Sequence, residues 1–249
     1  MIFDVAPPRL EPANKSSGDV PPPAQDKEDG ELIVRSWNLR PRPGRYDDAL
    51  GLITEGVKLA ERHGARGTRL TQAATAGPTT GLLVLTSEFD SLAAYGTYLD
   101  ETNMDAEAQS YGHRVREAEA PFIYESTAVM IEIDLDRPSG RTDRGRVLDA
   151  RFARPLPGRW DDILAFAREA FDWCDEHGAL GCRLFELNHA GEHSGWLCAV
   201  MEYNSMKEFG TAGDAWMTDA AAQRLTTTMR ATSPFEPISS GLFTEVTVL

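Results

Sequence analysis

Two histidines and two carboxylates gather in one short part of the chain, the stretch NHAGEHSGW and the Glu186 just before it. His189 and His193 lie four residues apart, and Glu192 lies between them. Two imidazoles and one carboxylate are the ligand set of many non-heme iron sites. The stretch is typical of a tight turn between strands, however, and lacks the helical geometry that aims such side chains at one point. We therefore favour an exposed loop over a metal site at His189 and His193.

Two arginine–glutamate combinations recur on neighbouring strand-like segments. If Pro78–Thr79 forms a two-residue turn, Arg69 falls opposite Glu88, and the same count around the second turn sets Arg183 opposite Glu202. Opposite charges that face each other across a ladder stabilise a sheet by roughly 0.2–1 kcal/mol. Their occurrence in two places favours a structural role. If the same face lines an interior, the guanidinium groups are also suited to bind an anionic or carbonyl oxygen.

Aromatic and polar side chains are unevenly spread between the two halves of the chain. The first half has Tyr111 and His113 on one helical segment, whereas the matching segment of the second half has no histidine. An imidazole is the group most often used for general acid–base chemistry. Core packing explains any one of the aromatic residues better than a ligand site does. The other members of this uneven set are Trp37, Tyr95, Tyr98, Phe209 and Trp216.

The elements that must position these residues occur twice. The string RPRPGRYDDAL begins at Arg40, and RPLPGRWDDIL begins 114 residues later at Arg154. The same spacing matches further residues without a gap as far as Gln109 and Gln223, as expected for two copies of one unit. The sequence therefore predicts four parts: a Pro-rich acidic flexible arm at 1–30, a first repeat at 31–136, a linker at 137–145 and a second repeat at 146–249.

The repeated string itself predicts a corner between a strand and a helix. Pro-Gly is typical of a turn, and the acidic pair that follows, Asp47–Asp48 or Asp161–Asp162, is suited to cap the free amides of a helix. His63 and His177 each precede a glycine at the other end of that helix, which favours a C-cap over a catalytic base. We interpret these residues as scaffold because they recur in both copies.

Each repeat has the same order of elements. Alternating apolar residues predict strands, and apolar residues at three-to-four spacing predict helices. The order is strand, helix, strand, strand, helical region, strand, which is the split βαβ arrangement of ferredoxin-like folds and an α+β class. In the first repeat these elements cover 31–39, 47–64, 67–74, 81–89, 91–116 and 127–133.

The repeat length, the element order and the aromatic-rich second helical region resemble the dimeric α/β-barrel superfamily over residues 32–249. Within it, the chain resembles NIPSNAP-type proteins and antibiotic-biosynthesis-monooxygenase-type domains. In that superfamily two ferredoxin-like units close their sheets into one barrel. The resemblance therefore implies an intramolecular α/β-barrel pseudo-dimer made by the two βαββαβ repeats.

The resemblance also implies a site. Pockets in such barrels lie between the sheet and its helices, and the second helical region contributes aromatic, Asn and His side chains. The implied catalytic set is His113 as a base with Tyr111 and Asn103, and the implied substrate-binding residues are Trp37, Arg69, Tyr95, Arg183 and Trp216. The expected function is a cofactor-independent, monooxygenase-like reaction on an aromatic or polyketide-like small molecule. Related barrels bind heme, but no axial histidine stands out besides His113, and no cofactor is predicted.

Composition narrows the classes of partner. The formal net charge is −14, which opposes binding to nucleic acid or anionic membranes. Neither a membrane-length apolar run nor a signal peptide is expected from the sequence. Three cysteines without a paired spacing favour a reducing cytoplasm.

The alternative function is a non-catalytic binding or assembly protein, in which residues 1–30 reach a protein partner. A homodimer of the whole chain is a further expected association.

Overall fold

The computed structural model describes residues 32–137 and 143–247. The N-terminal arm, and with it the protein partner expected to bind there, lies outside these residues. The first repeat contains β1 (Ile33–Pro41), α1 (Tyr46–Arg62), β2 (Arg66–Thr75), β3 (Leu83–Phe89), α2 (Leu92–Met104), α3 (Ala106–Arg116) and β4 (Phe122–Glu132). The second contains β5 (Val147–Pro155), α4 (Trp160–Glu176), β6 (Gly181–His189), β7 (Leu197–Tyr203), α5 (Met206–Thr218), α6 (Ala220–Thr232) and β8 (Phe235–Glu245).

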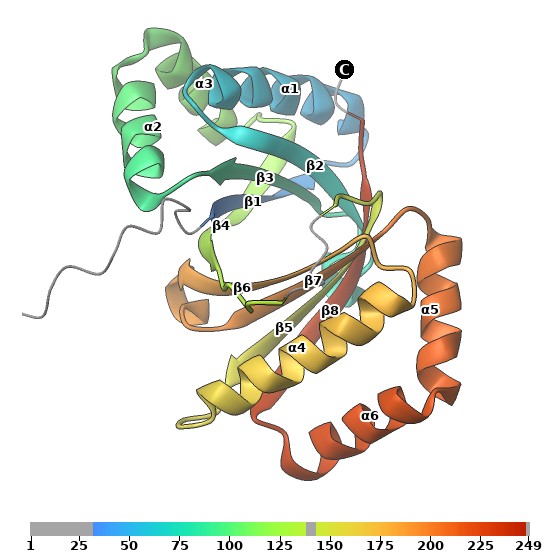
Figure 1. The fold of residues 1–249 in the computed structure, drawn as a ribbon. Helices are drawn as coiled ribbons and strands as arrows, with labels where there is room; N and C mark the ends of the chain where they lie inside the picture. The colour runs from blue at the N-terminus through green and yellow to red at the C-terminus, as the bar shows by residue number, and fades with distance from the viewer. Residues whose placement is uncertain (1–31, 138–142, 248–249) are drawn as a thin grey trace, which may run out of the picture.

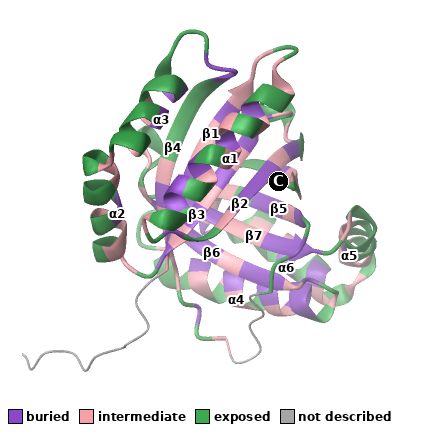
Figure 2. Ribbon diagram, turned by 90° about the horizontal axis from the view of Figure 1, so that it is seen from above, coloured by how far each residue is buried: buried purple, intermediate pink, exposed green. Residues whose placement is uncertain are grey.

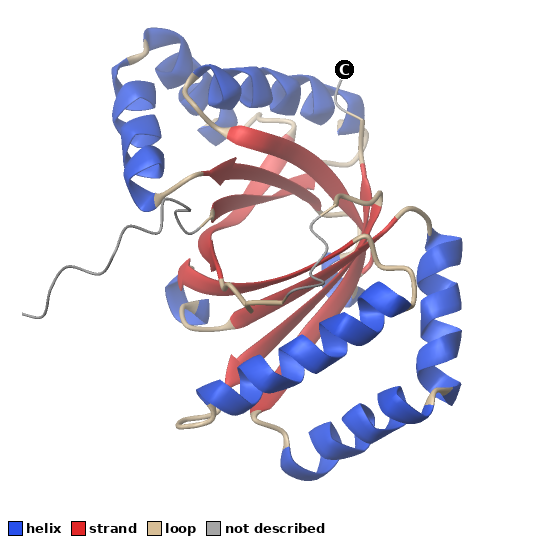
Figure 3. Cartoon of the chain, viewed as in Figure 1, coloured by secondary structure: helices blue, strands red, loops and turns tan. Residues whose placement is uncertain are grey.

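The strands form one closed antiparallel barrel in the order β1-β3-β2-β8-β5-β7-β6-β4. Each repeat supplies one four-stranded sheet, and the sheets join where β2 pairs with β8 and β4 pairs with β6. A single sheet of this kind would leave one face bare, and closure buries both inner faces against each other. The helices of the two repeats cover opposite outer sides of the barrel (Figures 1 and 3). This arrangement confirms the predicted pair of ferredoxin-like repeats.

Strand alternation sends neighbouring side chains to different cores. In the first repeat Leu70 and Leu83 face outward and pack with Ile53 of α1. Inside the barrel, Phe185 and Val34 belong to an apolar cluster that both repeats share. Figure 2 shows many buried residues on the strands that lie under the helices, whereas the outer sides of the helices and part of β4 are exposed.

The strand-to-helix corner is formed as predicted, but its helix is not capped by aspartate. Gly44 has a φ of 71° and Gly158 a φ of 72°, a conformation that glycine adopts without steric cost. The cap residues are Arg45 and Arg159, and neither makes a side-chain cap bond. The acidic residue three positions later accepts a hydrogen bond from the arginine instead, as Asp162 does from Arg159 at 2.5 Å. The corner is scaffold, closed by an exposed ion pair.

Both long helices end at the predicted histidines. His63 and His177 are the C-cap residues of α1 and α4. The glycines that follow, Gly64 and Gly178, have φ angles of 88° and 98° and turn the chain out of the helix. A C-cap role is therefore confirmed for these two positions.

The second helical region is broken in each repeat. Asp105 ends α2 and caps α3 by accepting a hydrogen bond from the Glu107 amide at 2.8 Å. Asp219 does the same for α6 with the amides of Ala221 and Ala222, both at 2.9 Å. The two aspartates are 114 residues apart, so the break belongs to the repeated scaffold.

The turn between β2 and β3, and the matching turn between β6 and β7, are longer than predicted. A short 3₁₀ turn at Gly77–Thr79 connects β2 to β3, and Arg69 lies opposite Thr86 rather than Glu88. In the second repeat the turn is Gly191–His193, and Arg183 lies opposite Val200. The predicted cross-strand pairing of arginine with glutamate was wrong, because the longer turn moves the register by two residues.

Candidate functional site

A cavity of about 870 Å³ lies in the second repeat, between its sheet and the helices α4, α5 and α6. The hairpin residues Thr75, Ala76 and Gly77 of the first repeat also line it. In Figure 1 this region lies between the yellow-to-red helices and the β5–β8 pair. Its lining is mostly apolar and includes the aromatic residues Phe152, Phe166, Phe171, Trp173, Phe209 and Trp216.

The cavity exists because small residues replace large ones. Ala199 and Ala212 line it, and the residues 114 positions earlier are Leu85 and Tyr98. In the first repeat only about 10 Å³ of space remains at the equivalent place. Tyr111 also fills space between the sheet and the helices of the first repeat, since its hydroxyl lies directly against Gly56 and would collide with a Cβ there. A comparison of side-chain sizes between the repeats is the sequence signal that points to this cavity.

An ion pair on β5 is the main polar feature of the cavity wall. Arg151 donates from Nε and Nη2 to one oxygen, Oδ2, of Asp149, at 3.0 and 2.8 Å. The Asp149 side chain is 7% exposed and the Arg151 side chain 59% exposed. Burial alone would lower the pKa of Arg151, but the charge and hydrogen bonds of Asp149 raise it above its ordinary value. The guanidinium therefore stays charged beside an apolar cavity.

A thiol and a phenol line the same cavity. Cys174 of α4 faces it, and a hydrogen bond with Cys182, with help from the Arg151 charge, lowers the pKa of Cys174. Burial raises the pKa of Tyr203 on β7. Trp216 donates its indole N–H to Thr226 at 3.1 Å, so its ring is held in place at the wall. Sequence reasoning selected Trp216 for this site and missed the other cavity residues named here.

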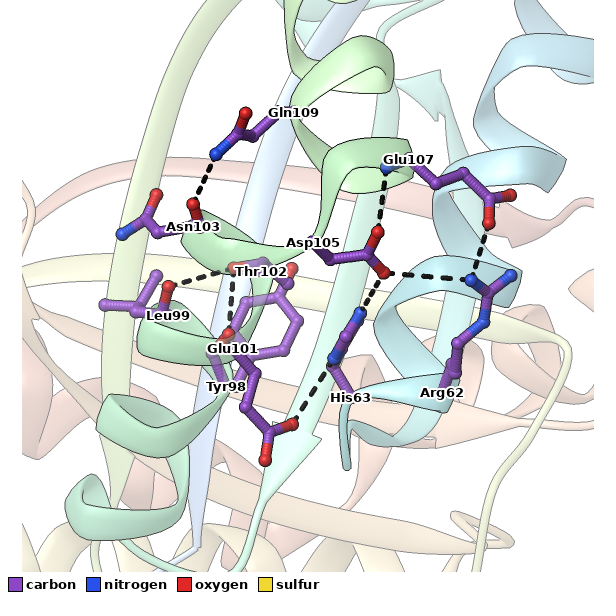
Figure 4. Close-up of polar contacts among 10 residues, drawn as sticks. All are labelled: Arg62, His63, Tyr98, Leu99, Glu101, Thr102, Asn103, Asp105, Glu107 and Gln109. Atoms are coloured by element: carbon purple, nitrogen blue, oxygen red, sulfur yellow. Dashed lines mark hydrogen bonds and ion pairs between the residues drawn. The ribbon is translucent and has the colours of Figure 1, made fainter.

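The residues predicted as catalytic do not meet in one pocket. Tyr111 is buried under α1, and its hydroxyl has no hydrogen-bond partner among the described residues. His113 and Asn103 are exposed, on α3 and α2. Figure 4 shows the surroundings of Asn103, whose backbone oxygen accepts a hydrogen bond from Gln109 at 2.5 Å. The catalytic role of these residues stays a prediction, without a shared cavity to support it.

Trp37 and Tyr95 pack within the first repeat. The guanidinium of Arg35 lies 4.0 Å from the centre of the Trp37 ring and donates to the Tyr98 hydroxyl at 2.7 Å. Tyr95 packs against Phe89, with 5.2 Å between ring centres. These contacts fill the space that a ligand would need on this side.

The other two predicted ligand-binding residues lie at the barrel interior. Arg69 donates to Glu202 at 2.9 Å, and Arg183 donates to Glu88 at 3.0 Å. Each arginine thus pairs with the glutamate of the other repeat, and neither lines the cavity of the second repeat.

The histidines of the 189–193 turn are exposed. His193 packs on Trp196 with 4.3 Å between ring centres, and its Nε2 is 3.7 Å from Glu192. Within residues 32–137 and 143–247, no three His, Cys, Asp or Glu side chains form a group that could hold a metal ion. In the same residues, no helix is long and apolar enough to span a membrane.

No protein-family model and no curated protein matches this sequence. Solved structures do match. An anthrone oxidase-like protein is 16% identical, with a TM-score of 0.56 over 88% of this chain and 93% of its own. A predicted monooxygenase of Fusobacterium nucleatum subsp. nucleatum is 9% identical, with a TM-score of 0.55 over 88% and 94%. A mutant chlorite dismutase of Candidatus Nitrospira defluvii is 10% identical, with a TM-score of 0.52 over 87% and 92%.

The chain has the dimeric α/β-barrel fold. These solved dimeric α/β-barrel structures are matched over nearly their whole length, and this chain also carries both of its barrel halves in one polypeptide. At such identities the likeness concerns the fold, so the chemistry of the site is argued from its own residues.

A histidine-held heme does not fit the cavity. Its lining contains no histidine, and His113 lies on the other repeat. Arg151 is the one basic residue of the lining among the described residues. Heme iron in proteins is most often held by a proximal His, with two acidic propionates to accommodate. We derive no reaction step through heme.

Proposed function

We propose that the second-repeat cavity binds an aromatic or polyketide-like small molecule and that the chain acts on it as a cofactor-independent, monooxygenase-like enzyme. One observation carries the proposal: an aromatic-lined cavity of about 870 Å³ that contains a few polar groups. Ligand sites are typically apolar hollows of about 300–1,000 Å³ with a small number of placed polar groups. The names of the anthrone oxidase-like and monooxygenase neighbours agree with this class.

The reaction class needs a group that removes a proton from an activated carbon. Asp149 lines the cavity and is the one carboxylate among its lining residues in the described part of the chain. We assign it the role of proton acceptor. The resulting carbanion reacts with dioxygen, so that a CH₂ group and O₂ become a carbonyl group and water. Charge interactions beside an apolar lining are stronger than in water.

The cavity is tested by giving it the side chains of the first repeat. Ala199→Leu combined with Ala212→Tyr should fill it, because those residues close the equivalent space in the first repeat. Quenching of tryptophan fluorescence by anthrone then reports binding, since Trp173 and Trp216 line the cavity. Thr211→Leu, on the exposed side of α5, is the matched control. Undiminished anthrone binding by the filled variant would refute the site.

The assigned base is tested against the base predicted from the sequence. Asp149→Asn should lower the rate of oxygen consumption with anthrone by about 10²–10⁴-fold, the usual contribution of a general base. His113→Ala should leave the rate unchanged, because His113 is exposed on the other repeat. If activity is lost only in the His113 variant, the reaction takes place in the first repeat and not in the cavity.

A further inference from the structure

We propose that the ligand of the second-repeat cavity carries an acidic oxygen, as a carboxylate, phenolate or enolate, and that Arg151 binds that oxygen. This inference rests on the proposed function, because it names the class of molecule that the same cavity takes. It concerns recognition rather than turnover, so it can be tested without any reaction.

The ion pair presents its two charges unequally to the cavity. Asp149 is 7% exposed and accepts both hydrogen bonds from Arg151 at a single oxygen. Arg151 is 59% exposed and lines the cavity. The guanidinium is therefore the more exposed of the two charges in the cavity wall, and the hydrogen bonds from Arg151 leave Oδ1 of Asp149 unused.

Arg151 keeps donors available for a ligand. Its Nε and Nη2 atoms bond to Asp149, and Nη1 makes no hydrogen bond to any residue in the described part of the chain. A guanidinium has five N–H groups in a rigid planar fork, which suits carboxylate oxygens. Around these donors the wall is apolar, where a charge-assisted hydrogen bond is stronger than in water.

The first repeat shows that the barrel scaffold does not require this arrangement. At the positions matched to Asp149 and Arg151 it has Arg35 and Trp37. There the arginine lies over the tryptophan ring and donates to Tyr98, so its charge is used within the core. A cation that points into open space is thus particular to the repeat with the cavity.

The test compares two ligands of nearly equal shape. 2-Naphthoate has a carboxylate, and 2-naphthamide has a neutral amide at the same place. Isothermal titration with the full chain should show naphthoate binding at least about tenfold more tightly, as expected when a charged group gains a charge-assisted partner. Arg151→Met, which keeps much of the side-chain length, should abolish the difference and leave naphthamide binding unchanged.

Two further variants separate recognition from a structural effect. Asp149→Asn removes the competing negative charge and should tighten naphthoate binding severalfold, whereas a purely structural pair would predict weaker binding of both ligands. Arg151→Lys keeps the cation but not the fork, and should retain part of the preference for naphthoate. It also keeps the test informative if Arg151→Met fails to fold.

The outcomes distinguish this inference from the proposed function. Equal binding of naphthoate and naphthamide by the unchanged protein, or a preference that survives in Arg151→Met, overturns the role of Arg151 while the cavity remains a ligand site. If neither ligand binds the unchanged protein, and anthrone fails as well, the cavity proposal itself is overturned. A preference that is lost in Arg151→Met and enhanced in Asp149→Asn supports the inference.

Discussion

Arg69 of β2 donates a hydrogen bond to Glu202 of β7 at 2.9 Å, across the boundary between the two repeats. Both side chains are 7% exposed, and Glu202 also accepts from the Gly145 amide at 2.7 Å. In the related pair, Arg183 of the second repeat lies 3.0 Å from Glu88 of the first repeat. The two repeats are therefore held together by reciprocal ion pairs as well as by strand pairing.

Loss of one partner of the buried pair should strongly destabilise the barrel. We expect Arg69→Met to lower the free energy of unfolding by about 3–5 kcal/mol, because it leaves Glu202 buried and unpaired. Urea denaturation followed by circular dichroism measures the change. Arg66→Met is the matched control on the same strand, since the Arg66–Asp90 pair is exposed and worth at most about 1 kcal/mol. Similar losses in both variants would contradict a special role for the cross-repeat pair.

Glu132 should make stability fall as pH rises. Burial raises its pKa, and the Glu88 and Asp134 charges add to this effect, although Arg183 lowers it. A raised pKa means that the folded state binds the proton more readily than the unfolded state. Stability then declines as pH increases from the ordinary glutamate pKa through the folded value.

The Glu132→Gln variant checks this sign. We expect it to be more stable than the unchanged protein at neutral pH and equally stable at a pH below the ordinary glutamate range. Denaturant titrations at a series of pH values provide the measurement. A variant that is less stable at neutral pH would show that the attraction of Glu132 to Arg183, at 3.5 Å, outweighs the cost of burial.

Two glycines of α1 should respond oppositely to the same substitution. A Cβ at Gly51 meets nothing within 4 Å, so Gly51→Ala should stabilise the helix by roughly 0.5–1 kcal/mol. A Cβ at Gly56 would collide with the Tyr111 hydroxyl, so Gly56→Ala should destabilise by roughly 1–3 kcal/mol through overpacking. Thermal unfolding of the two variants tests how tightly Tyr111 closes the first repeat. Stabilisation by both substitutions would indicate room beside Tyr111.

Much of the fold follows from local patterns in the sequence. The 114-residue spacing revealed two copies of one unit, and the element order within each copy indicated the split βαβ arrangement. The corner glycines and the histidines at the helix ends are local features, set by backbone geometry within a few residues. A bare face on each sheet predicted that the two copies cover each other, and the resemblance to the dimeric α/β-barrel superfamily implied closure into one barrel.

Pairing between distant segments depended on the tertiary structure. The register of β2 against β3 is set by the length of the turn at Gly77–Thr79, which the sequence suggested to be shorter. Thr86 and Glu88 are two residues apart and lie on the same face of β3. The alternation of side chains along a strand therefore could not show which of them lies opposite Arg69. Barrel closure then supplied Glu202 as its partner, from 133 positions away along the chain.

The sequence by itself determined that the two repeats share a scaffold and that they differ in aromatic and small residues. Only the tertiary structure decided which difference matters. A cavity is the space left among side chains from several elements, and Ala199 and Ala212 open it only because α5 packs over β7 without filling that volume. The types of side chain predicted a site at His113 and Tyr111 in the first repeat. The unfilled cavity places the candidate site around Arg151 in the second repeat instead.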